Sequence, residues 1–281
     1  MPYTVITPEQ ELEMIRDNYE RDLSSNLIQK KYHVSASRLS KIFSKYGVSV
    51  KKNIHKGKYS FDKNFFYEQN PNLAYFLGWV SSDGWIQEKS NNIGIEIQQS
   101  DKKVLEDISK AMKYTRPLRL FDRESRGQGK FCRFVIENAE IKKLLVEKYE
   151  ITPQKTTKNF CFNFQNLDKK FWKDYIRGYF DGDGSIKKGN SLSFQIDSAS
   201  LKMILALQQA IRELDDSISL SVGEREPYTE EENQNLEIKH LLPIYRLYCY
   251  GENAKKIFDL IYQDAEIYLE RKHDKYLQYV K

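Results

Sequence analysis

The sequence is poor in cysteine and lacks long apolar runs. Its three cysteines, Cys132, Cys161 and Cys249, lie far apart, so they provide neither a metal-ligand spacing nor a disulfide framework. Chains without disulfides are typical of a reducing interior, and we expect a cytoplasmic setting. No stretch approaches the roughly 18 consecutive apolar residues of a membrane helix. The acidic N-terminus also lacks the basic start and apolar core of a signal peptide, so we expect no membrane partner.

Acidic residues are missing from one segment of the chain. Residues 24–60 hold nine lysines and arginines and no aspartate or glutamate, whereas the whole chain, with 45 basic and 40 acidic residues, is nearly balanced. A basic block of this kind is either a solvated face or the electrostatic footprint of a nucleic-acid site. Charge alone leaves both interpretations open.

Residues 8–47 have the pattern of three short helices. Pro8 begins the first, Ser25 can cap the second, and Ser35 can cap the third, which ends at Gly47. Two helices joined by a tight turn, the second with a polar face, are typical of a helix-turn-helix. The polar face of the third helix offers candidate DNA contacts, which are Ser35, Ser37, Arg38, Lys41 and Lys45.

This segment resembles the helix-turn-helix of resolvases and small repressors. It departs from their pattern at Gln29, where a small residue is usual, and at His33, where glycine is usual. The alternative is a three-helix packing module that does not contact DNA. The coincidence of the acid-free stretch with the second and third helices favours the helix-turn-helix.

We predict three parts: a small all-α domain over residues 1–47, a basic linker over 48–66, and a larger domain over 67–281. In the linker, Lys51 and Lys52 can follow a phosphate backbone. An inert tether is the alternative.

The larger domain contains an internal repeat of about 100 residues. Each copy has a helix ending in Asp-Gly, a short strand, an alternating strand, a helix, a hairpin and a further helix. In this alignment residues 77–86 match 177–186, residues 93–97 match 192–196, and residues 137–139 match 252–254. Two copies in one chain imply a pseudo-twofold domain, so we expect a monomer. Double-stranded DNA with a long, partly palindromic target is the natural partner for such symmetry.

The two Asp-Gly helices contain the strongest chemical signal. Gly78 and Gly178 occupy equivalent places, where the missing side chain lets two helix backbones approach closely. If the helices pack together, Asp83 and Asp183 meet at their C-terminal ends. Mutual repulsion and the negative ends of the helix dipoles disfavour two carboxylates there. A divalent cation relieves this cost, and carboxylate ligands suit Mg²⁺ or Mn²⁺.

These residues resemble the LAGLIDADG motif of homing endonucleases. Residues 178–186 match it closely, and residues 77–86 resemble a diverged first copy with Ser81 in place of an earlier acidic residue. The resemblance implies an α+β fold of two αββαββα halves, about 67–160 and 165–281, whose sheets form a saddle over DNA. It also implies that Asp83 and Asp183 bind catalytic metal, with help from the backbone carbonyls of Ser82 and Gly182.

Further site residues follow from the repeat and the resemblance. Lys155 and Lys272 close the two halves at matching places and resemble the family's active-site lysines; phosphate positioning or a surface salt bridge is the alternative. Gln99, aligned with Ser198, resembles a solvent-orienting residue. The alternating strands place polar side chains opposite the core, Glu96 and Asp197 among them. On this face we expect the DNA contacts to be made by Gln98, Arg119, Arg133, Gln195 and Arg246.

Together these features predict a site-specific endonuclease that hydrolyses both strands of DNA with a divalent metal. One alternative is a non-cleaving DNA-binding transcriptional regulator, against which the two costly carboxylates argue. The other is an RNA maturase that assists intron splicing, and the sequence does not separate it from the nuclease.

Overall fold

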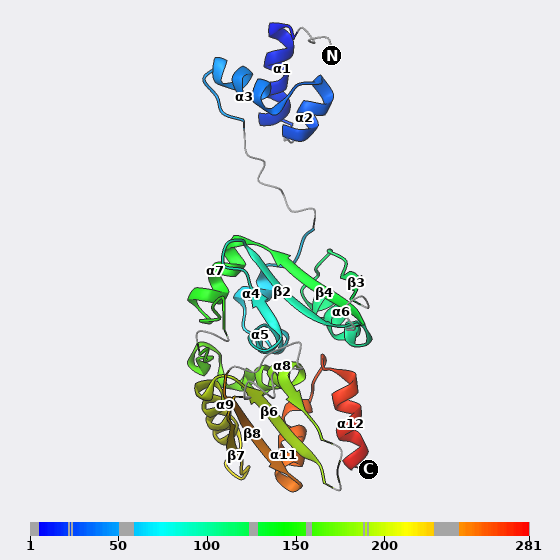
Figure 1. Cartoon of the computed structure of the whole chain (residues 1–281), viewed down its shortest axis with the longest axis vertical. Helices are drawn as coiled ribbons and strands as arrows, with labels where there is room; N and C mark the ends of the chain where they lie inside the picture. The colour runs from blue at the N-terminus through cyan, green and yellow to red at the C-terminus, as the bar shows by residue number, and fades with distance from the viewer. Residues whose placement is uncertain are drawn as a thin grey trace. The chain divides into compact units, whose positions relative to one another are not determined.

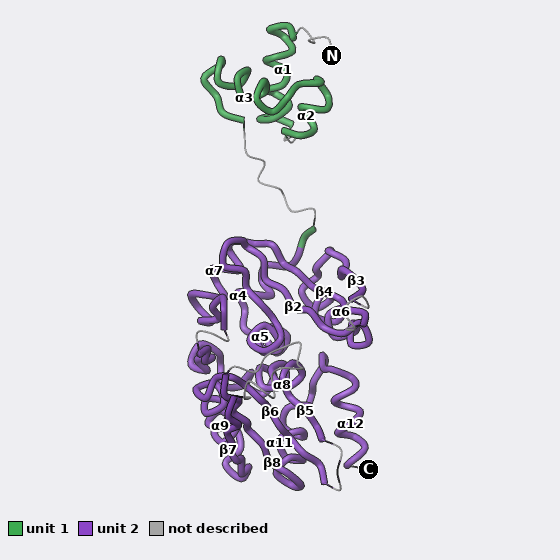
Figure 2. The backbone as a smooth tube through the Cα atoms, viewed as in Figure 1, with its two compact units in different colours: residues 1–60 green, residues 61–281 purple. Residues whose placement is uncertain are grey.

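The computed structural model describes residues 6–21, 23, 25–50, 59–123, 129–155, 159–187, 189, 191–227 and 242–280. The chain divides into two compact units, residues 1–60 and residues 61–281 (Figure 2). Among the described residues, no helix combines the length and the apolar content needed to cross a membrane.

The first unit is a three-helix bundle of α1 (Pro8–Tyr19), α2 (Ser25–Tyr32) and α3 (Ala36–Lys45). The side chain of Thr7 caps α1, with Pro8 at the first helical position, and Ser35 caps α3. Helix α2 begins at Ser25 itself, one residue earlier than a cap at that position allows. The core is formed by buried side chains from all three helices, which are Met14, Ile28, Leu39, Ile42 and Phe43.

The turn between α2 and α3 has a left-handed residue. His33 has a φ of +51°, in the region where glycine is most easily accommodated. A helix-turn-helix commonly has glycine here, so the backbone keeps the expected shape although the residue differs. DNA contact by this unit stays a prediction.

The second unit contains two copies of one element order (Figure 1). The first copy consists of α5 (Pro71–Ser81), β1 (Gly84–Ile86), β2 (Asn92–Gln98), α6 (Lys102–Ala111), β3 (Arg119–Asp122), β4 (Lys130–Glu137) and α7 (Ala139–Glu147). The second consists of α8 (Trp172–Asp183), β5 (Gly184–Ser185), β6 (Ser193–Ser198), α9 (Leu201–Leu214), β7 (Ser221–Arg225), β8 (Ile244–Tyr250) and α11 (Glu252–Tyr262). The predicted αββαββα order is therefore confirmed in both halves. Additional short elements are α4 (Asn64–Tyr67) and the turns η1 (Gln99–Asp101), η3 (Phe164–Asn166) and η4 (Lys169–Phe171), and α12 (Glu270–Val280) follows the second half.

Helices α5 and α8 lie side by side at the middle of this unit (Figure 1). Their contact is made by backbone, because a Cβ on Gly78 would lie 2.3 Å from the carbonyl oxygen of Tyr175. A Cβ on Gly178 would lie 2.1 Å from the carbonyl oxygen of Tyr75. Only glycine permits this approach at either position, as the sequence predicts.

Each half has a four-stranded antiparallel sheet. The strand orders are β1-β2-β4-β3 and β5-β6-β8-β7. Gly84 pairs with Ile95 in the first sheet, and Gly184 pairs with Ile196 in the second. Ile95 is therefore equivalent to Ile196 and not, as the sequence alignment has it, to Phe194. Because side chains alternate with period two, a shift of two residues keeps the same face towards the core, so the pattern alone does not reveal it.

The boundary between the units, at residues 60 and 61, lies earlier than the end of the predicted linker. Residues 61–66 belong to the second unit, where Phe66 is fully buried and the ring of Phe61 lies 5.8 Å from that of Tyr114. The linker prediction over 48–66 is therefore wrong for residues 61–66, because their aromatic side chains complete the core of the first half. At the other end, Val48 and Val50 pack against the core of the first unit. The candidate contacts Lys51 and Lys52 lie outside the described residues.

Candidate active site

Asp83 and Asp183 lie at the adjoining C-terminal ends of α5 and α8. Asp183 is the last residue of α8, and Asp83 follows α5 by two residues. The ends touch, because a Cβ on Gly182 would lie 2.0 Å from the Oγ of Ser82 and 3.4 Å from the backbone nitrogen of Asp83. The predicted packing of the two Asp-Gly helices therefore brings the two aspartates to one place.

The surroundings of these carboxylates disfavour their charged forms. Both side chains are exposed to solvent, yet many protein atoms surround them and reduce their hydration. Desolvation, together with the charge of Asp83, raises the pKa of Asp183 to about 7. Desolvation also raises the pKa of Asp83, opposed by the charges of Lys272 and Lys155. An accessible pair that repels itself is a favourable binding site for a cation.

Lys155 and Lys272 each hold the end of one Asp-Gly helix. The Nζ of Lys155 donates to the carbonyls of Val80 and Ser82, the latter at 2.9 Å. The Nζ of Lys272 donates to the carbonyls of Phe180, Asp181 and Gly182 at 2.7, 2.8 and 3.1 Å.

The two lysines are also electrostatically alike. Burial lowers the pKa of each to about 8, opposed in Lys155 by the nearby Asp183 and Asp83 and in Lys272 chiefly by Asp181. A lysine with this pKa can hold or release a proton near neutral pH. The structure thus places both predicted lysines beside the carboxylates.

Asp181 differs from the two site aspartates in being fully enclosed. It accepts hydrogen bonds from the hydroxyl of Tyr75 at 2.7 Å, the hydroxyl of Tyr262 at 3.2 Å and the backbone N–H of Leu269 at 2.8 Å. These donors come from α5, from α11 and from the segment just before α12, which carries Lys272. Asp181 therefore links the end of α8 to the segment that leads into α12 and Lys272. The sequence alone gives no signal for this role.

The donor set fits a hard divalent cation that keeps part of its water shell. Among the described residues, no group of three or more His, Cys, Asp or Glu side chains converges on one point. Mg²⁺ commonly binds proteins through one or two carboxylates and completes its shell with water and phosphate oxygens, which matches Asp83 and Asp183. The predicted carbonyl ligands of Ser82 and Gly182 already accept hydrogen bonds from the lysines. Each retains a second lone pair.

The other candidate residues are less tightly grouped. Gln99 begins η1 after β2 and is half-buried, while Gln98 and Arg119 are exposed. Gln195 was expected on an open face, but it is only 5% exposed and donates to Asp197 at 2.9 Å.

In the first unit most of the candidate side chains are exposed. The Oγ of Ser35 caps α3 and lies 3.1 Å from the Oγ of Ser37. Arg38 is half-buried and Lys41 is exposed. Lys45 forms an ion pair with Glu11 at 2.5 Å, so it is already neutralised within the unit.

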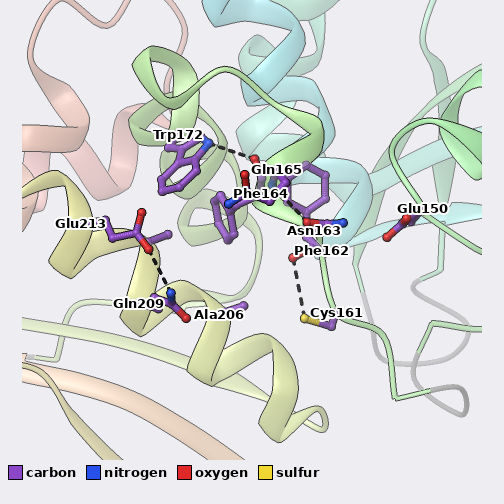
Figure 3. A pocket seen from close by; sticks show the side chains of 11 residues that line it. Glu150, Cys161, Phe162, Asn163, Phe164, Gln165, Trp172, Ala206, Gln209 and Glu213 are labelled. Atoms are coloured by element: carbon purple, nitrogen blue, oxygen red, sulfur yellow. Dashed lines mark hydrogen bonds between the residues drawn. The ribbon is translucent and has the colours of Figure 1, made fainter.

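A separate hollow of about 360 Å³ lies at the opposite end of α8 (Figure 3). Trp172 lines it and begins α8, whereas Asp183 ends that helix, about 16 Å away at 1.5 Å per residue. The indole N–H of Trp172 is satisfied by the carbonyls of Phe164 and Leu167 at 3.1 and 2.8 Å. This hollow therefore contributes nothing to the chemistry of the paired carboxylates.

Comparisons with known proteins agree with this architecture. The family model of the LAGLIDADG-like domain matches residues 70–114 and 172–262, which include Asp83 and Asp183 and stop before Lys272. No curated relative matches the chain in sequence.

Several solved structures are similar to the chain. The I-LtrWI LAGLIDADG homing endonuclease bound to target DNA is 13% identical, with a TM-score of 0.44 and coverage of 75% of this chain and 88% of that one. I-SmaMI bound to uncleaved DNA with calcium is 12% identical, with a TM-score of 0.42 and coverage of 76% and 90%. The N-terminal LAGLIDADG domain of DUF199/WhiA is 12% identical, with a TM-score of 0.44 and coverage of 68% and 82%.

Proposed function

Because this chain belongs to the LAGLIDADG family, we propose that it is a site-specific endonuclease that hydrolyses phosphodiester bonds on both strands of duplex DNA. The observation that carries the proposal is the doubled centre at the ends of α5 and α8. Each helix end has one solvent-open aspartate and one lysine fixed on its last carbonyls. Cutting two strands requires two such centres close to a twofold axis.

Asp83 and Asp183 are the residues that would hold the divalent metal. A bound Mg²⁺ would neutralise phosphate charge, lower the pKa of a bound water and stabilise the leaving oxygen. The carboxylates themselves fix where this charge is placed, since each is attached to a helix end whose position is set by backbone contact at Gly78 and Gly178. A regulator that does not cleave DNA gains nothing from two carboxylates whose repulsion it must bear.

Lys155 and Lys272 complete the two centres. Their hydrogen bonds to helix-end carbonyls hold each ammonium group near the carboxylates. With a pKa of about 8, each lysine is protonated at neutral pH and places a positive charge beside the scissile phosphate. Its proton can also be exchanged with solvent as the pH rises towards 8.

The first unit provides a second attachment to DNA. We expect the basic face of α3, with Arg38 and Lys41, to contact DNA phosphates. The double variant Arg38→Ala/Lys41→Ala should lower the log–log salt slope of binding by about 1.8, at roughly 0.9 per phosphate contact. Lys255→Ala is the control, because that lysine is paired with Asp259 on α11. An unchanged slope in the double variant would refute DNA contact by α3.

The direct test is a cleavage selection. The full-length protein is incubated with Mg²⁺ and plasmids that carry randomised inserts, and the ends of linear products are sequenced. We expect one family of sites, cut at the same position in every molecule, and no cutting with Ca²⁺ in place of Mg²⁺. If no duplex is cut with Mg²⁺ or Mn²⁺ while structured intron RNA is bound tightly, the maturase alternative replaces this proposal.

A further inference from the structure

Each sheet has one arginine held by a carboxylate at the same cross-strand position. In the first sheet Glu96 on β2 lies opposite Arg133 on β4, and in the second Asp197 on β6 lies opposite Arg246 on β8. Glu96 follows Ile95 and Asp197 follows Ile196, the two residues that pair with Gly84 and Gly184. The two carboxylate–arginine pairs are therefore related by the pseudo-twofold symmetry.

Both arginines lie on the sheet face turned away from the core. On β4, Cys132 and Phe134 flank Arg133 in sequence and are buried, so the side chain between them points to the other face. On β8, Tyr245 and Leu247 flank Arg246; Leu247 is buried and Tyr245 is half-buried against the core. The arginine side chains are 30% and 35% exposed, so part of each is open to solvent.

The carboxylates occupy one edge of each guanidinium group. Arg246 donates from Nε to Oδ1 of Asp197 at 2.7 Å and from Nη2 to Oδ2 at 3.0 Å. Arg133 donates from Nε to Oε2 of Glu96 at 2.6 Å, and its Nη2 contacts the same oxygen. This arrangement leaves Nη1 and the outer hydrogen of Nη2 as a pair of parallel donors at the end of the side chain. It also fixes the side chain, so less conformational freedom is lost on binding.

The surroundings of the arginines strengthen this restraint. The guanidinium carbon of Arg133 lies 5.0 Å from the ring centroid of Phe121, and Arg123 also pairs with Glu96 at 2.5 Å. Arg246 lines a shallow hollow of about 270 Å³ together with Tyr248 and Tyr250. Both arginine side chains are thus partly exposed, while neighbouring side chains restrain them.

We propose that Arg133 and Arg246 each recognise a guanine, at equivalent positions of the two half-sites. In the major groove, guanine presents the acceptors O6 and N7 side by side, and they match the two donors that each arginine keeps free. The inference rests on the proposed function, in that the partner is duplex DNA lying across both sheets. It adds a constraint on the target: one G·C pair in each half-site, equally distant from the centre.

The test is a binding selection with the full-length protein, randomised duplexes and no divalent cation, followed by sequencing of the bound DNA. We expect two enriched guanines, related by the twofold axis, each preferred about 5- to 150-fold, the range of a bidentate arginine–guanine contact of roughly 1–3 kcal/mol. Arg133→Ala should erase the preference at one position only, and Arg246→Ala at the other only. Asp197→Asn should weaken the same position as Arg246→Ala.

Arg119→Ala is the matched control. Arg119 lies opposite Arg133 on the same face and is exposed, and in the described part of the chain it has no carboxylate partner. Its loss should weaken binding to all sequences alike. The inference is overturned if Arg133→Ala and Arg246→Ala leave both base preferences intact, or if Arg119→Ala removes one of them. If the protein enriches and cleaves a site without the paired guanines, only this inference is refuted. If no duplex is enriched, the proposed function is refuted as well.

Discussion

The two helix ends that form the candidate active site are chemically alike but differently supported. At the end of α8, the buried Asp181 receives three hydrogen bonds from three separate segments, and Lys272 is anchored within the helix α12. At the end of α5, Ser81 takes the equivalent place, and its buried hydroxyl has no hydrogen-bond partner in the described part of the chain. The proposed catalytic residues are therefore duplicated, while the residues that support them are not. Two helix ends can therefore carry the same chemical groups on different supports, and the cleavage rates of the two DNA strands can be compared to test this difference.

The largest effect is expected from the paired carboxylates. Asp83→Asn and Asp183→Asn should each reduce double-strand cleavage by about a thousandfold or more, because the charge that holds the metal contributes several kcal/mol. Specific DNA binding should persist, since asparagine is nearly isosteric. A supercoiled plasmid with the selected site, assayed with Mg²⁺, reports both nicking and linearisation. Full linearisation by Asp83→Asn would leave Asp183 as the sole supported metal ligand and would break the equivalence of the two helix ends.

The lysines should come next. Lys155→Ala and Lys272→Ala should each slow cleavage of bound DNA by about 10²- to 10⁴-fold, the usual contribution of a positioned proton-transfer or charge-stabilising group. Single-turnover rates with saturating protein separate this loss from any change in affinity. If either variant binds more weakly but cuts bound DNA at the parental rate, that lysine is a phosphate contact only.

The unequal support can be tested with Asp181→Asn and Ser81→Ala as a matched pair. Asparagine at 181 places an amide donor against the N–H of Leu269 or the tyrosine hydroxyls, so the segment that carries Lys272 should shift. A misplacement of this kind should slow one strand about tenfold more than the other and let nicked DNA accumulate. Ser81→Ala should leave both strand rates unchanged. Equal slowing of both strands by Asp181→Asn would show that Asp181 acts on general stability and not on one centre.

The smallest effect concerns stability without metal. The pKa of Asp183 is raised in the folded protein to about 7, so the fold favours its protonated form. Stability is therefore lost as the pH rises from about 4 through 7, because the carboxylate must ionise in an unfavourable place. Asp183→Asn should melt a few degrees higher than the parent at pH 8 and at the same temperature near pH 4. A difference that is independent of pH would mean that repulsion at this site is not the cause.

Much of this architecture could be predicted from the sequence because it depends on local sequence patterns. The repeat, the two glycines and the aspartates five residues after them predicted the packing of α5 on α8. The register of β6 was misaligned by two residues, since alternation with period two looks the same after such a shift. The boundary at residue 61 was missed because Phe61, Phe65 and Phe66 carry no periodicity of their own and join the core only through tertiary contacts. The role of Asp181 depends on Tyr75, Tyr262 and Leu269, which are far apart in the sequence and give no local signal.

The backbone contact between Gly78 and Gly178 has a consequence for how such a protein can change over time. The two helix backbones touch at these glycines, so the separation of the two aspartates depends on main-chain atoms more than on side chains elsewhere. The arginines and carboxylates on the outer sheet faces, by contrast, can be exchanged without disturbing that contact. Under the proposed function, the recognised DNA sequence can therefore change through the sheet residues while the spacing of the two cuts stays the same, and a change at either glycine should alter that spacing.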